Sequence, residues 1–201
     1  MKRAIIDLNI DPRVYTVDRF LSPAECTHMI SIANTNNMKR AKVSGAQKGI
    51  ISDGRTNSVC WLDHSVDKVF EDVALRISSL IGLPLTYAES FQLIHYLEGA
   101  QYKPHFDAFD PKTDAGQRNM ANGGQRLITV LGYLNTPGTG GGTNFPRLKL
   151  SIPAEAGKLV IFHNCSPGLM ERHSLSLHGG APVEQGEKWA FNLWFRASAR
   201  R

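Results

Sequence analysis

The feature that most constrains the fold of this chain is a change of hydrophobic period near Ala88. From Glu89 to Leu97 apolar and polar side chains alternate, which is the two-residue period of a β-strand. Short strand patterns also occupy residues 14–21, 126–135, 148–152, 158–163 and 189–196. Short strands with turn sequences every 8 to 12 residues predict a sandwich of sheets or a barrel.

Two helices are expected before most of these strands. Ser22 is expected to cap the first helix, with Pro23 in its first turn and Glu25 completing a capping box. In the second helix, over 66–80, apolar residues recur at intervals of three and four, and Gly82 ends it. The sequence therefore predicts an α+β fold that is mainly β, with a β core braced by N-terminal helices.

Length and composition indicate one domain and no membrane span. With 201 residues, of which 42% are hydrophobic and 20% charged, the chain is expected to form a single domain over 1–201. No apolar run approaches the ~20 residues of a transmembrane helix, and no signal peptide is expected at the basic N-terminus. Cys26, Cys60 and Cys165 are odd in number and far apart, which favours reduced thiols and a cytoplasmic protein.

The net charge of +5 does not by itself indicate a nucleic-acid partner. Lysine and arginine residues are scattered along the chain, and no block of five like charges occurs. We therefore expect neither a nucleic-acid nor a membrane partner, and the oligomeric state is left open.

The strongest chemical signal comes from two short stretches, 102–107 and 174–178. On an extended strand, His105 and Asp107 point to the same face. A histidine and a carboxylate side by side, joined by a second histidine from far along the chain, form the three-ligand set that suits non-haem Fe(II). The alternative is a surface strand on which Asp107 forms a salt bridge.

Several motifs surround these stretches in a fixed order. They are Tyr96-x-x-Gly99-x-x-Tyr102-x-x-His105-x-Asp107, the strand 126–135, Gly141-Gly142-Thr143-Asn144-Phe145-Pro146, Ser176-Leu177-His178-Gly179-Gly180-Ala181-Pro182-Val183 and Gly186-Glu187-Lys188-Trp189. In order and spacing they resemble the prolyl 4-hydroxylase family of Fe(II)/2-oxoglutarate dioxygenases, over residues 12–198. With its short, single-domain chain, the protein is similar in organisation to bacterial and viral members of the family.

The resemblance implies a double-stranded β-helix, a jelly-roll whose mouth holds the iron. It also implies that the metal ligands are His105, Asp107 and His178. His173 is the competitor of His178, but only His178 fits the family's Ser-Leu-His-x-Gly-x-Pro-Val pattern and the ten-residue interval to Lys188.

By the same resemblance, Lys188 binds the distal carboxylate of 2-oxoglutarate; the alternative is a lysine that points outward at the start of its strand. Thr143 and a tyrosine are expected to donate hydrogen bonds to the same acid. Tyr102 is the better match for this tyrosine, and a core role is the alternative for Tyr96. The implied cofactors are Fe(II), 2-oxoglutarate as co-substrate and O2, with ascorbate as reductant.

Two residues match family positions close to the reacting peptide and are the expected catalytic residues, Arg126 and Trp189. The alternatives are a strand-end arginine and a core tryptophan. Residues 52–57 resemble the family segment that lies over the peptide, or else form a turn and an edge strand. Residues 110–124 show no periodicity directly after Asp107, so they are a candidate lid.

The function implied by the resemblance is hydroxylation of prolyl residues in a peptide or protein to 4-hydroxyproline, while 2-oxoglutarate and O2 become succinate and CO2. One alternative is a related oxygenase that acts on a free amino acid or another small molecule. Another is a jelly-roll binding module without activity. A nucleic-acid demethylase of the same superfamily fits less well, because those enzymes typically bind the co-substrate through an arginine on the last strand.

Overall fold

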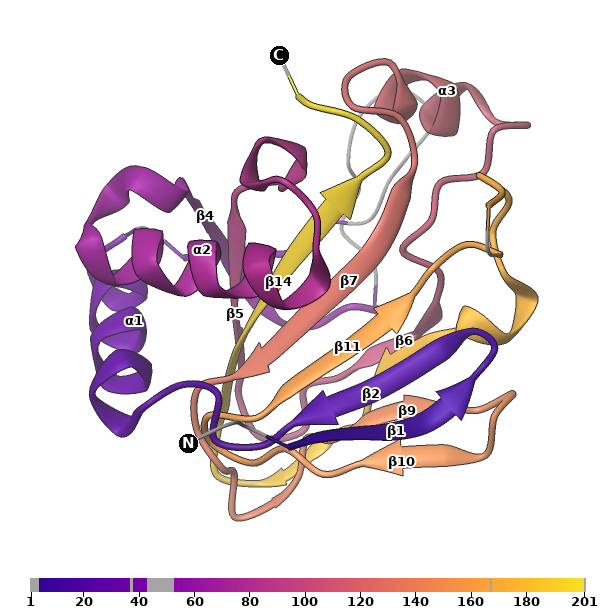
Figure 1. The fold of residues 1–201 in the computed structure, drawn as a ribbon. Helices are drawn as coiled ribbons and strands as arrows, with labels where there is room; N and C mark the ends of the chain where they lie inside the picture. The colour runs from indigo at the N-terminus through magenta and orange to yellow at the C-terminus, as the bar shows by residue number, and fades with distance from the viewer. Residues whose placement is uncertain (1–3, 37, 43–52, 167, 201) are drawn as a thin grey trace.

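The computed structural model describes residues 4–36, 38–42, 53–166 and 168–200 (Figure 1). The larger sheet has eight strands in the spatial order β1 (Ile5–Ile10), β2 (Arg13–Val17), β11 (Leu159–His163), β7 (Arg126–Tyr133), β14 (Lys188–Arg196), β5 (Phe91–Tyr96), β4 (Ser58–Leu62) and β3 (Lys39–Arg40). The smaller sheet has the order β10 (Leu150–Ile152), β9 (Thr143–Phe145), β12 (His178–Gly180) and β6 (Tyr102–His105). A third pair joins β13 (Val183–Gln185) to β8 (Thr139–Gly140). All pairings are antiparallel.

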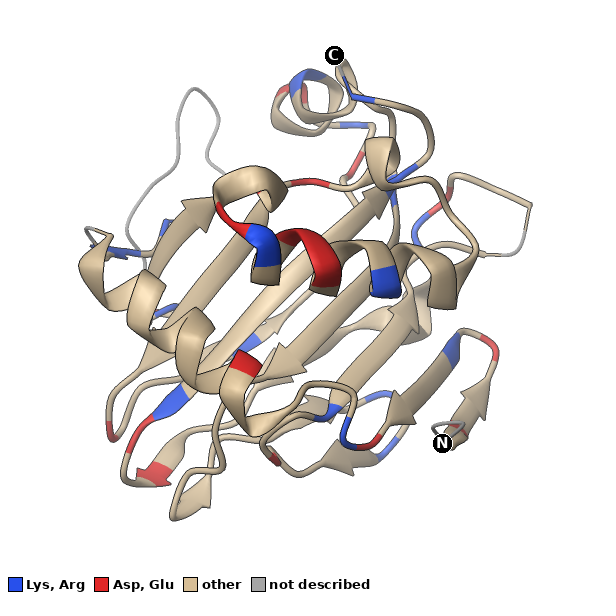
Figure 2. Ribbon diagram, turned by 60° about the vertical axis from the view of Figure 1, so that its left-hand side comes forward, with Lys and Arg blue, Asp and Glu red and all other residues tan. Residues whose placement is uncertain are grey.

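Helices α1 (Pro23–Thr35) and α2 (Lys68–Ile81) cover one face of the larger sheet (Figures 1 and 2). The core between them and the sheet takes alternate residues of β14, which are Trp189, Phe191, Leu193 and Phe195. A short helix, α3 (Asp114–Met120), lies away from these two (Figure 1). Three single turns of 3₁₀-helix span His64–Val66, Leu85–Tyr87 and Ser174–Ser176.

A second core lies on the opposite face of the larger sheet, where the smaller sheet packs. Leu131 and Phe162 of the larger sheet contribute to it together with Phe145 and Ile152 of the smaller one. The rings of Phe145 and Phe162 meet edge to face at 5.1 Å between centroids, a favourable aromatic geometry. Because successive residues of a strand point to opposite faces, each residue of β14 belongs either to the helix side or to the side between the sheets.

The helix boundaries confirm the expected capping box at Ser22 and the stop at Gly82, whereas α2 begins two residues after the expected start at Val66. In α1 the Ser22 hydroxyl accepts from the Glu25 N–H at 3.2 Å, and the Glu25 carboxylate accepts from the Ser22 N–H at 2.8 Å. This is the predicted capping box. Helix α2 begins at Lys68, where the Asp67 carboxylate accepts from two backbone N–H groups, and ends at Gly82, whose φ of 72° is in the left-handed region that favours glycine.

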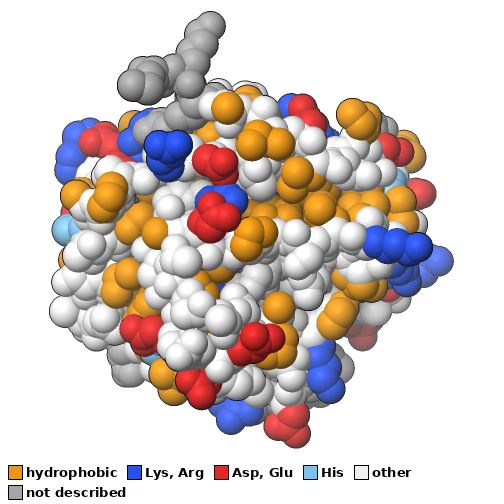
Figure 3. All heavy atoms as spheres, turned by 90° about the horizontal axis from the view of Figure 1, so that it is seen from below, with side chains coloured by type: hydrophobic (Ala, Val, Ile, Leu, Met, Phe, Trp, Pro, Cys, Tyr) orange, Lys and Arg blue, Asp and Glu red, His pale blue; other side chains and the backbone are white. Residues whose placement is uncertain are grey.

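The predicted elements did not include helix α3, the edge strand β1 or the short strands β8, β9, β12 and β13. Helix α3 falls inside the expected loop 110–124; it has only seven residues, and Thr113 caps it by accepting from the Gly116 N–H. Strand β1 alternates apolar and polar residues from Ile6 to Ile10, a signal that the prediction did not use. Its large apolar side chains are exposed, namely Ile5, Ile6, Leu8 and Ile10. Figure 3 shows exposed hydrophobic side chains on the side of the molecule on which β1 and β10 lie in Figure 1.

Two negative findings concern the described residues alone. Within them, no helix is both long enough and apolar enough to cross a membrane. The three cysteines are buried and form no disulfide, in agreement with the expected reduced thiols.

Candidate active site

Pairing of β6 with β12 brings the predicted metal ligands together. In this ladder His178 lies directly opposite His105, and Asp107 follows His105 by two residues. One ligand atom from each of the three lies within 4.8 Å of the others. Ligands separated by more than 70 positions in the sequence therefore meet because two short strands of the smaller sheet are neighbours.

Hydrogen bonds to the backbone orient both imidazoles for metal binding. The Nδ1 atom of His105 lies 2.9 Å from the carbonyl oxygen of Lys103, and Nδ1 of His178 lies 2.9 Å from that of Ser176. A carbonyl oxygen only accepts, so each Nδ1 carries a proton, and in the neutral ring the lone pair is then on Nε2, the atom that faces Asp107. Both Nε2 atoms lie 3.5 Å from a carboxylate oxygen of Asp107. The donor set therefore fits a divalent iron, with two neutral imidazoles and one carboxylate.

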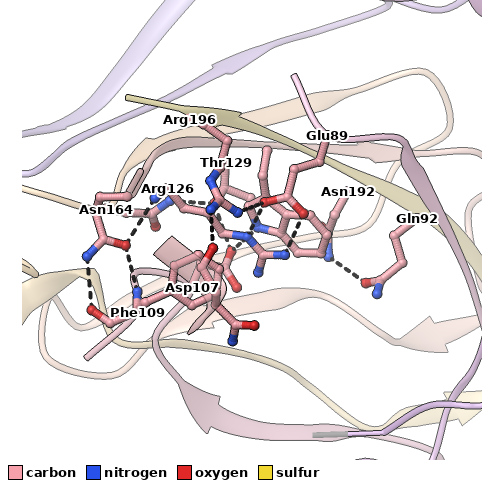
Figure 4. Close-up of polar contacts among 12 residues, drawn as sticks. Glu89, Gln92, Asp107, Phe109, Arg126, Thr129, Asn164, Asn192 and Arg196 are labelled. Atoms are coloured by element: carbon pink, nitrogen blue, oxygen red, sulfur yellow. Dashed lines mark hydrogen bonds and ion pairs between the residues drawn. The ribbon is translucent and has the colours of Figure 1, made fainter. Parts of the chain in front are cut away.

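The Asp107 carboxylate is itself held from behind (Figure 4). Its Oδ2 atom accepts from the Thr129 hydroxyl at 2.7 Å and from the Trp194 indole N–H at 2.9 Å. Thr129 in turn accepts from the side-chain amide of Asn164 at 2.8 Å. Such outer partners fix the orientation of a ligand before the metal arrives.

Burial and charge set the protonation state of the cluster. Burial alone would raise the pKa of Asp107, but the facing imidazoles of His178 and His105 and the charge of Arg126 hold that pKa well below its usual range. Burial lowers the pKa of His178 to about 4, although Asp107 opposes this shift. At neutral pH the site therefore offers one carboxylate and a neutral His178, the forms that bind a metal.

The same pocket contains a buried lysine. Lys188, the first residue of β14, is 2% exposed, and within the described residues it forms no ion pair with a carboxylate. Its ammonium group lies 4.9 Å from the ring centre of Tyr96 and 5.2 Å from that of Tyr133. Burial lowers the pKa of Lys188 to about 7. A buried cation without an anion is costly, so this end of the pocket fits an anionic ligand such as a carboxylate.

Hydroxyl groups surround Lys188. Two of them, on Thr143 and Tyr96, belong to residues that were expected to bind 2-oxoglutarate. The Thr143 and Tyr133 hydroxyls are hydrogen-bonded at 2.6 Å, and Thr143, Tyr96 and Lys188 line one pocket with the two histidines. Tyr102 and Tyr96 both line this pocket, so the preference for Tyr102 stays a prediction. Tyr102 stacks on His105 at 3.6 Å between ring centres, whereas Tyr96 lies beside Lys188.

Trp189 does not lie in the pocket, contrary to the expectation. It follows Lys188 directly on β14, so it points to the helix side, where its ring stacks on His95 at 4.0 Å. Its alternative role as a core tryptophan is the one that the structure supports. Trp194 shares the face of Lys188 and is the tryptophan that contacts Asp107, a predicted metal ligand. The sequence contained a signal that distinguishes the two tryptophans. Trp194 lies six residues after Lys188, an even number, and so shares its strand face, whereas Trp189 lies one residue after it and points to the opposite face.

Arg126 lies behind Trp194 in a buried ion-pair network (Figure 4). Its guanidinium group lies 3.7 Å from the Trp194 ring centre and makes two bonds to Glu89, at 2.6 and 2.8 Å. Arg196 binds the same carboxylate at 2.8 Å. Charge pairing with Glu89 raises the pKa of Arg126 despite its burial. Arg126 is therefore one ring away from Asp107 rather than in contact with it.

Arg196 also attaches the segment that was expected to be a lid. Its guanidinium group donates to the carbonyl oxygens of Asn119, Asn122 and Gly124. Residues 110–124 are thus joined through Arg196 to Glu89, in the network that supports the metal ligands. These bonds attach the C-terminal part of the segment, and its role as a lid stays a prediction.

The segment expected to cover the peptide is described from Asp53 onward, and Ser52 lies outside the described residues. Arg55 is buried, where it donates to Asn57 and Gln92 and lies 4.5 Å from the Tyr102 ring centre. Arg55 thus braces Tyr102, which in turn stacks on a metal ligand. Residues 58–62 continue as β4, an inner strand paired with both β3 and β5.

Comparison with known proteins places these features in a family. Residues 91–196 match the sequence profile of the 2OG-Fe(II) oxygenase superfamily. The chain is 34% identical over 205 residues to probable prolyl 4-hydroxylase 8 of Arabidopsis thaliana, with 92% of this chain and 69% of the relative covered. It is 30% identical to a putative prolyl 4-hydroxylase of Acanthamoeba polyphaga mimivirus, with 94% and 77% covered. The chain spans about two thirds of the length of the plant relatives.

Solved structures show the same fold. The viral collagen prolyl hydroxylase of Paramecium Bursaria Chlorella virus-1, in its 2OG complex, superposes with a TM-score of 0.73 at 27% identity, covering 92% of this chain and 96% of the viral one. A Pseudomonas putida prolyl-4-hydroxylase superposes with a TM-score of 0.65 at 18% identity, covering 91% and 92%. The mainly β architecture agrees with the expected double-stranded β-helix.

Proposed function

Because this chain belongs to the 2OG-Fe(II) oxygenase superfamily, and within it to the prolyl 4-hydroxylase family, we propose that it hydroxylates prolyl residues of a peptide or protein. In this reaction 2-oxoglutarate and O2 are converted to succinate and CO2 while a C–H bond of proline, at C4 in our proposal, becomes C–OH. One oxygen atom enters succinate and the other enters the product.

One observation supports this proposal above the others: a single pocket contains both an iron-binding triad and an unpaired buried lysine. His105, Asp107 and His178 would hold Fe(II), and three ligands on one side leave coordination positions open. Lys188 would neutralise the distal carboxylate of 2-oxoglutarate, with Thr143 as a hydrogen-bond donor at the same end of the pocket. When bound, the iron supplies the redox chemistry that activates O2.

The chain's own residues orient and enclose this chemistry. The backbone carbonyls of Lys103 and Ser176 fix the two imidazole planes, and the Trp194 N–H fixes the carboxylate. Tyr96 and Tyr133 form walls around Lys188; burial raises the pKa of each well above its usual range, so both phenols stay protonated and able to donate. Exclusion of water strengthens the attraction between the lysine and an acid.

The assay that tests the proposal is mass spectrometry of proline-rich peptides after incubation with the protein, Fe(II), 2-oxoglutarate and ascorbate as the proposed reductant. We expect a gain of one oxygen on proline, with one succinate formed for each hydroxyl, and neither product with His178→Ala. Succinate that forms without any peptide oxidation, over a broad set of peptides, would instead favour a small-molecule substrate. Iron binding without either product would favour a binding module.

A further inference from the structure

A second hollow opens beside the catalytic pocket, at the β3 edge of the larger sheet. It has a volume of about 540 Å³ and is lined by residues of β3, β4 and β5 and by residues next to these strands, namely Asn36, Lys39, Arg40, Lys42, Val59, Cys60, Trp61 and Gln92. Gln92 faces Asn192 of β14 across the ladder, and their side chains meet at 3.5 Å. Because Asn192 lines the catalytic pocket, the two hollows adjoin at this pair.

An exposed aromatic ring lies at the junction of the two hollows. Trp61 is 49% exposed, and its ring centre is 5.8 Å from that of Trp194, the residue that donates to Asp107. Aromatic surfaces next to a groove are common in the recognition of proline-rich chains. A polypeptide with its proline at the metal centre would therefore pass over Trp61 if it continued toward β3.

The far side of this hollow carries positive charge. Lys39, Arg40 and Lys42 line it, and Figure 2 shows Lys and Arg at this edge of the larger sheet. The sequence has no Asp or Glu between Glu25 and Asp53. Among the described residues, the one ion pair of these three cations joins Arg40 to the fully exposed Asp53 at 3.8 Å, a weak contact in water. The edge is therefore positively charged with little internal compensation.

From these observations we infer that the hollow binds the substrate polypeptide on one side of the target proline and selects acidic side chains there. The inference rests on the proposed prolyl hydroxylation and adds the substrate class, a proline followed or preceded at a fixed distance by Asp or Glu. An acidic peptide fits better than a nucleic acid, because the cations border a hollow that adjoins the catalytic pocket and contains an aromatic ring.

Strand spacing gives the distance between proline and acid. From β14 to β3 there are three strand steps, which amount to roughly 14 Å at about 4.8 Å per step. An extended or polyproline chain advances about 3.1–3.3 Å per residue. Dividing the first distance by the second places the acidic side chains about three to five residues from the hydroxylated proline.

The test uses peptides with one central proline and two glutamates three to five positions away, on the N-terminal side in one peptide and on the C-terminal side in another. Matched peptides carry glutamine instead, and a positional control carries the glutamates ten positions away. We expect kcat/KM to be about tenfold higher for one of the two glutamate peptides than for its glutamine match at low salt. This advantage should largely vanish in 0.5 M salt because screening is then strong.

Variants test whether Lys39, Arg40 and Lys42 cause the preference for glutamate peptides. The triple variant Lys39→Gln, Arg40→Gln, Lys42→Gln should treat the glutamate and glutamine peptides alike. Lys149→Asn removes one exposed cation from the turn between β9 and β10, at the far edge of the other sheet, and should keep the preference. Asn is chosen there because Lys149 has a φ of 53°, which Asn tolerates. An unchanged thermal shift with 2-oxoglutarate shows that each variant is folded.

Equal rates with glutamate and glutamine peptides, or an equal gain from glutamates ten positions away, would overturn the inference. Tighter competition by a short RNA than by the free acidic peptide would also overturn it, in favour of a nucleic-acid surface. Binding of the same labelled peptides is measured in parallel by fluorescence anisotropy. If no peptide is hydroxylated but the glutamate peptide still binds more tightly through Lys39, Arg40 and Lys42, the proposed reaction fails while the acidic preference stands.

Discussion

The two ends of the catalytic pocket are built in opposite ways. At the metal end, every charge faces a partner: Asp107 accepts from Thr129 and Trp194 and faces two imidazoles. At the other end, Lys188 is equally buried but has aromatic rings and hydroxyls around it instead of a carboxylate. The first end is stable before any ligand arrives, and the second is stabilised only when an anion binds. The difference shows that the unpaired Lys188 lowers the stability of the ligand-free protein in favour of anion binding.

The largest effect is expected from loss of a metal ligand. His178→Ala or Asp107→Ala should reduce succinate formation to background, because the remaining two ligands no longer hold Fe(II) in the pocket. Anaerobic Fe(II) titration and a succinate assay measure this. His163→Ala is the matched control, since that histidine belongs to β11 and lies outside the three-residue cluster. Retention of iron-dependent turnover by His178→Ala would reopen the case for His173.

Removal of the unpaired lysine should change affinity and stability in opposite directions. In Lys188→Met the KM for 2-oxoglutarate should rise by about 10²–10³, because the acid loses its buried partner. The ligand-free variant should be more stable than the natural chain by roughly 2–4 kcal/mol, since a buried cation disappears. Urea denaturation with and without 2-oxoglutarate measures both. A destabilised ligand-free variant would show that Lys188 has an anionic partner within the protein.

The depressed pKa of Lys188 also predicts a pH dependence. The pKa falls from an ordinary value of 10.5 to about 7 in the folded protein, so between these values the unfolded chain binds more protons. The free energy of unfolding of the ligand-free protein should therefore rise with pH from about 7 to 10.5. The affinity for 2-oxoglutarate should fall by up to about tenfold per pH unit above 7, because binding requires the protonated lysine.

Comparison of the natural chain with Lys188→Arg isolates this effect. Arginine keeps its charge over the whole range, so the difference in pH dependence between the two proteins reports the lysine alone. Thermal unfolding and isothermal titration at pH 6 to 10 are the measurements. Parallel pH profiles of the two proteins would argue against titration of Lys188.

The smallest effect is expected at the outer support of the metal end. Trp194→Phe keeps an aromatic ring against Arg126 but removes the hydrogen bond to Asp107, and Fe(II) affinity should fall about 10- to 100-fold. Trp189→Phe on the opposite face of β14 should leave iron affinity unchanged and lower stability instead. Fe(II) titration of the two variants compares them directly. Equal iron affinities would remove Trp194 from the set of supporting residues.

Local sequence patterns determined much of this protein. The capping box at Ser22, the amphipathic period of α2 and the stop at Gly82 depend on neighbours within a few residues, so they could be predicted. The spacing of His105 and Asp107 predicted two neighbouring side chains for the same reason, although β6 ends at His105 and Asp107 lies just beyond it. The motifs around His178 and Lys188 then indicated a family, and hence a ligand set that the fold brings together.

Only the tertiary structure decided which side chains support that set. Residues of four segments make up the network from Asp107 through Trp194 and Arg126 to Glu89 and Arg196, and no local pattern links them. Trp189 and Trp194 point to opposite faces of β14. Which of these faces lines the pocket depends on where the helices and the smaller sheet pack. Local sequence therefore determined the two long helices, the longer strands and the residues of the ligand triad, while long-range packing determined the remaining elements and how the triad is held.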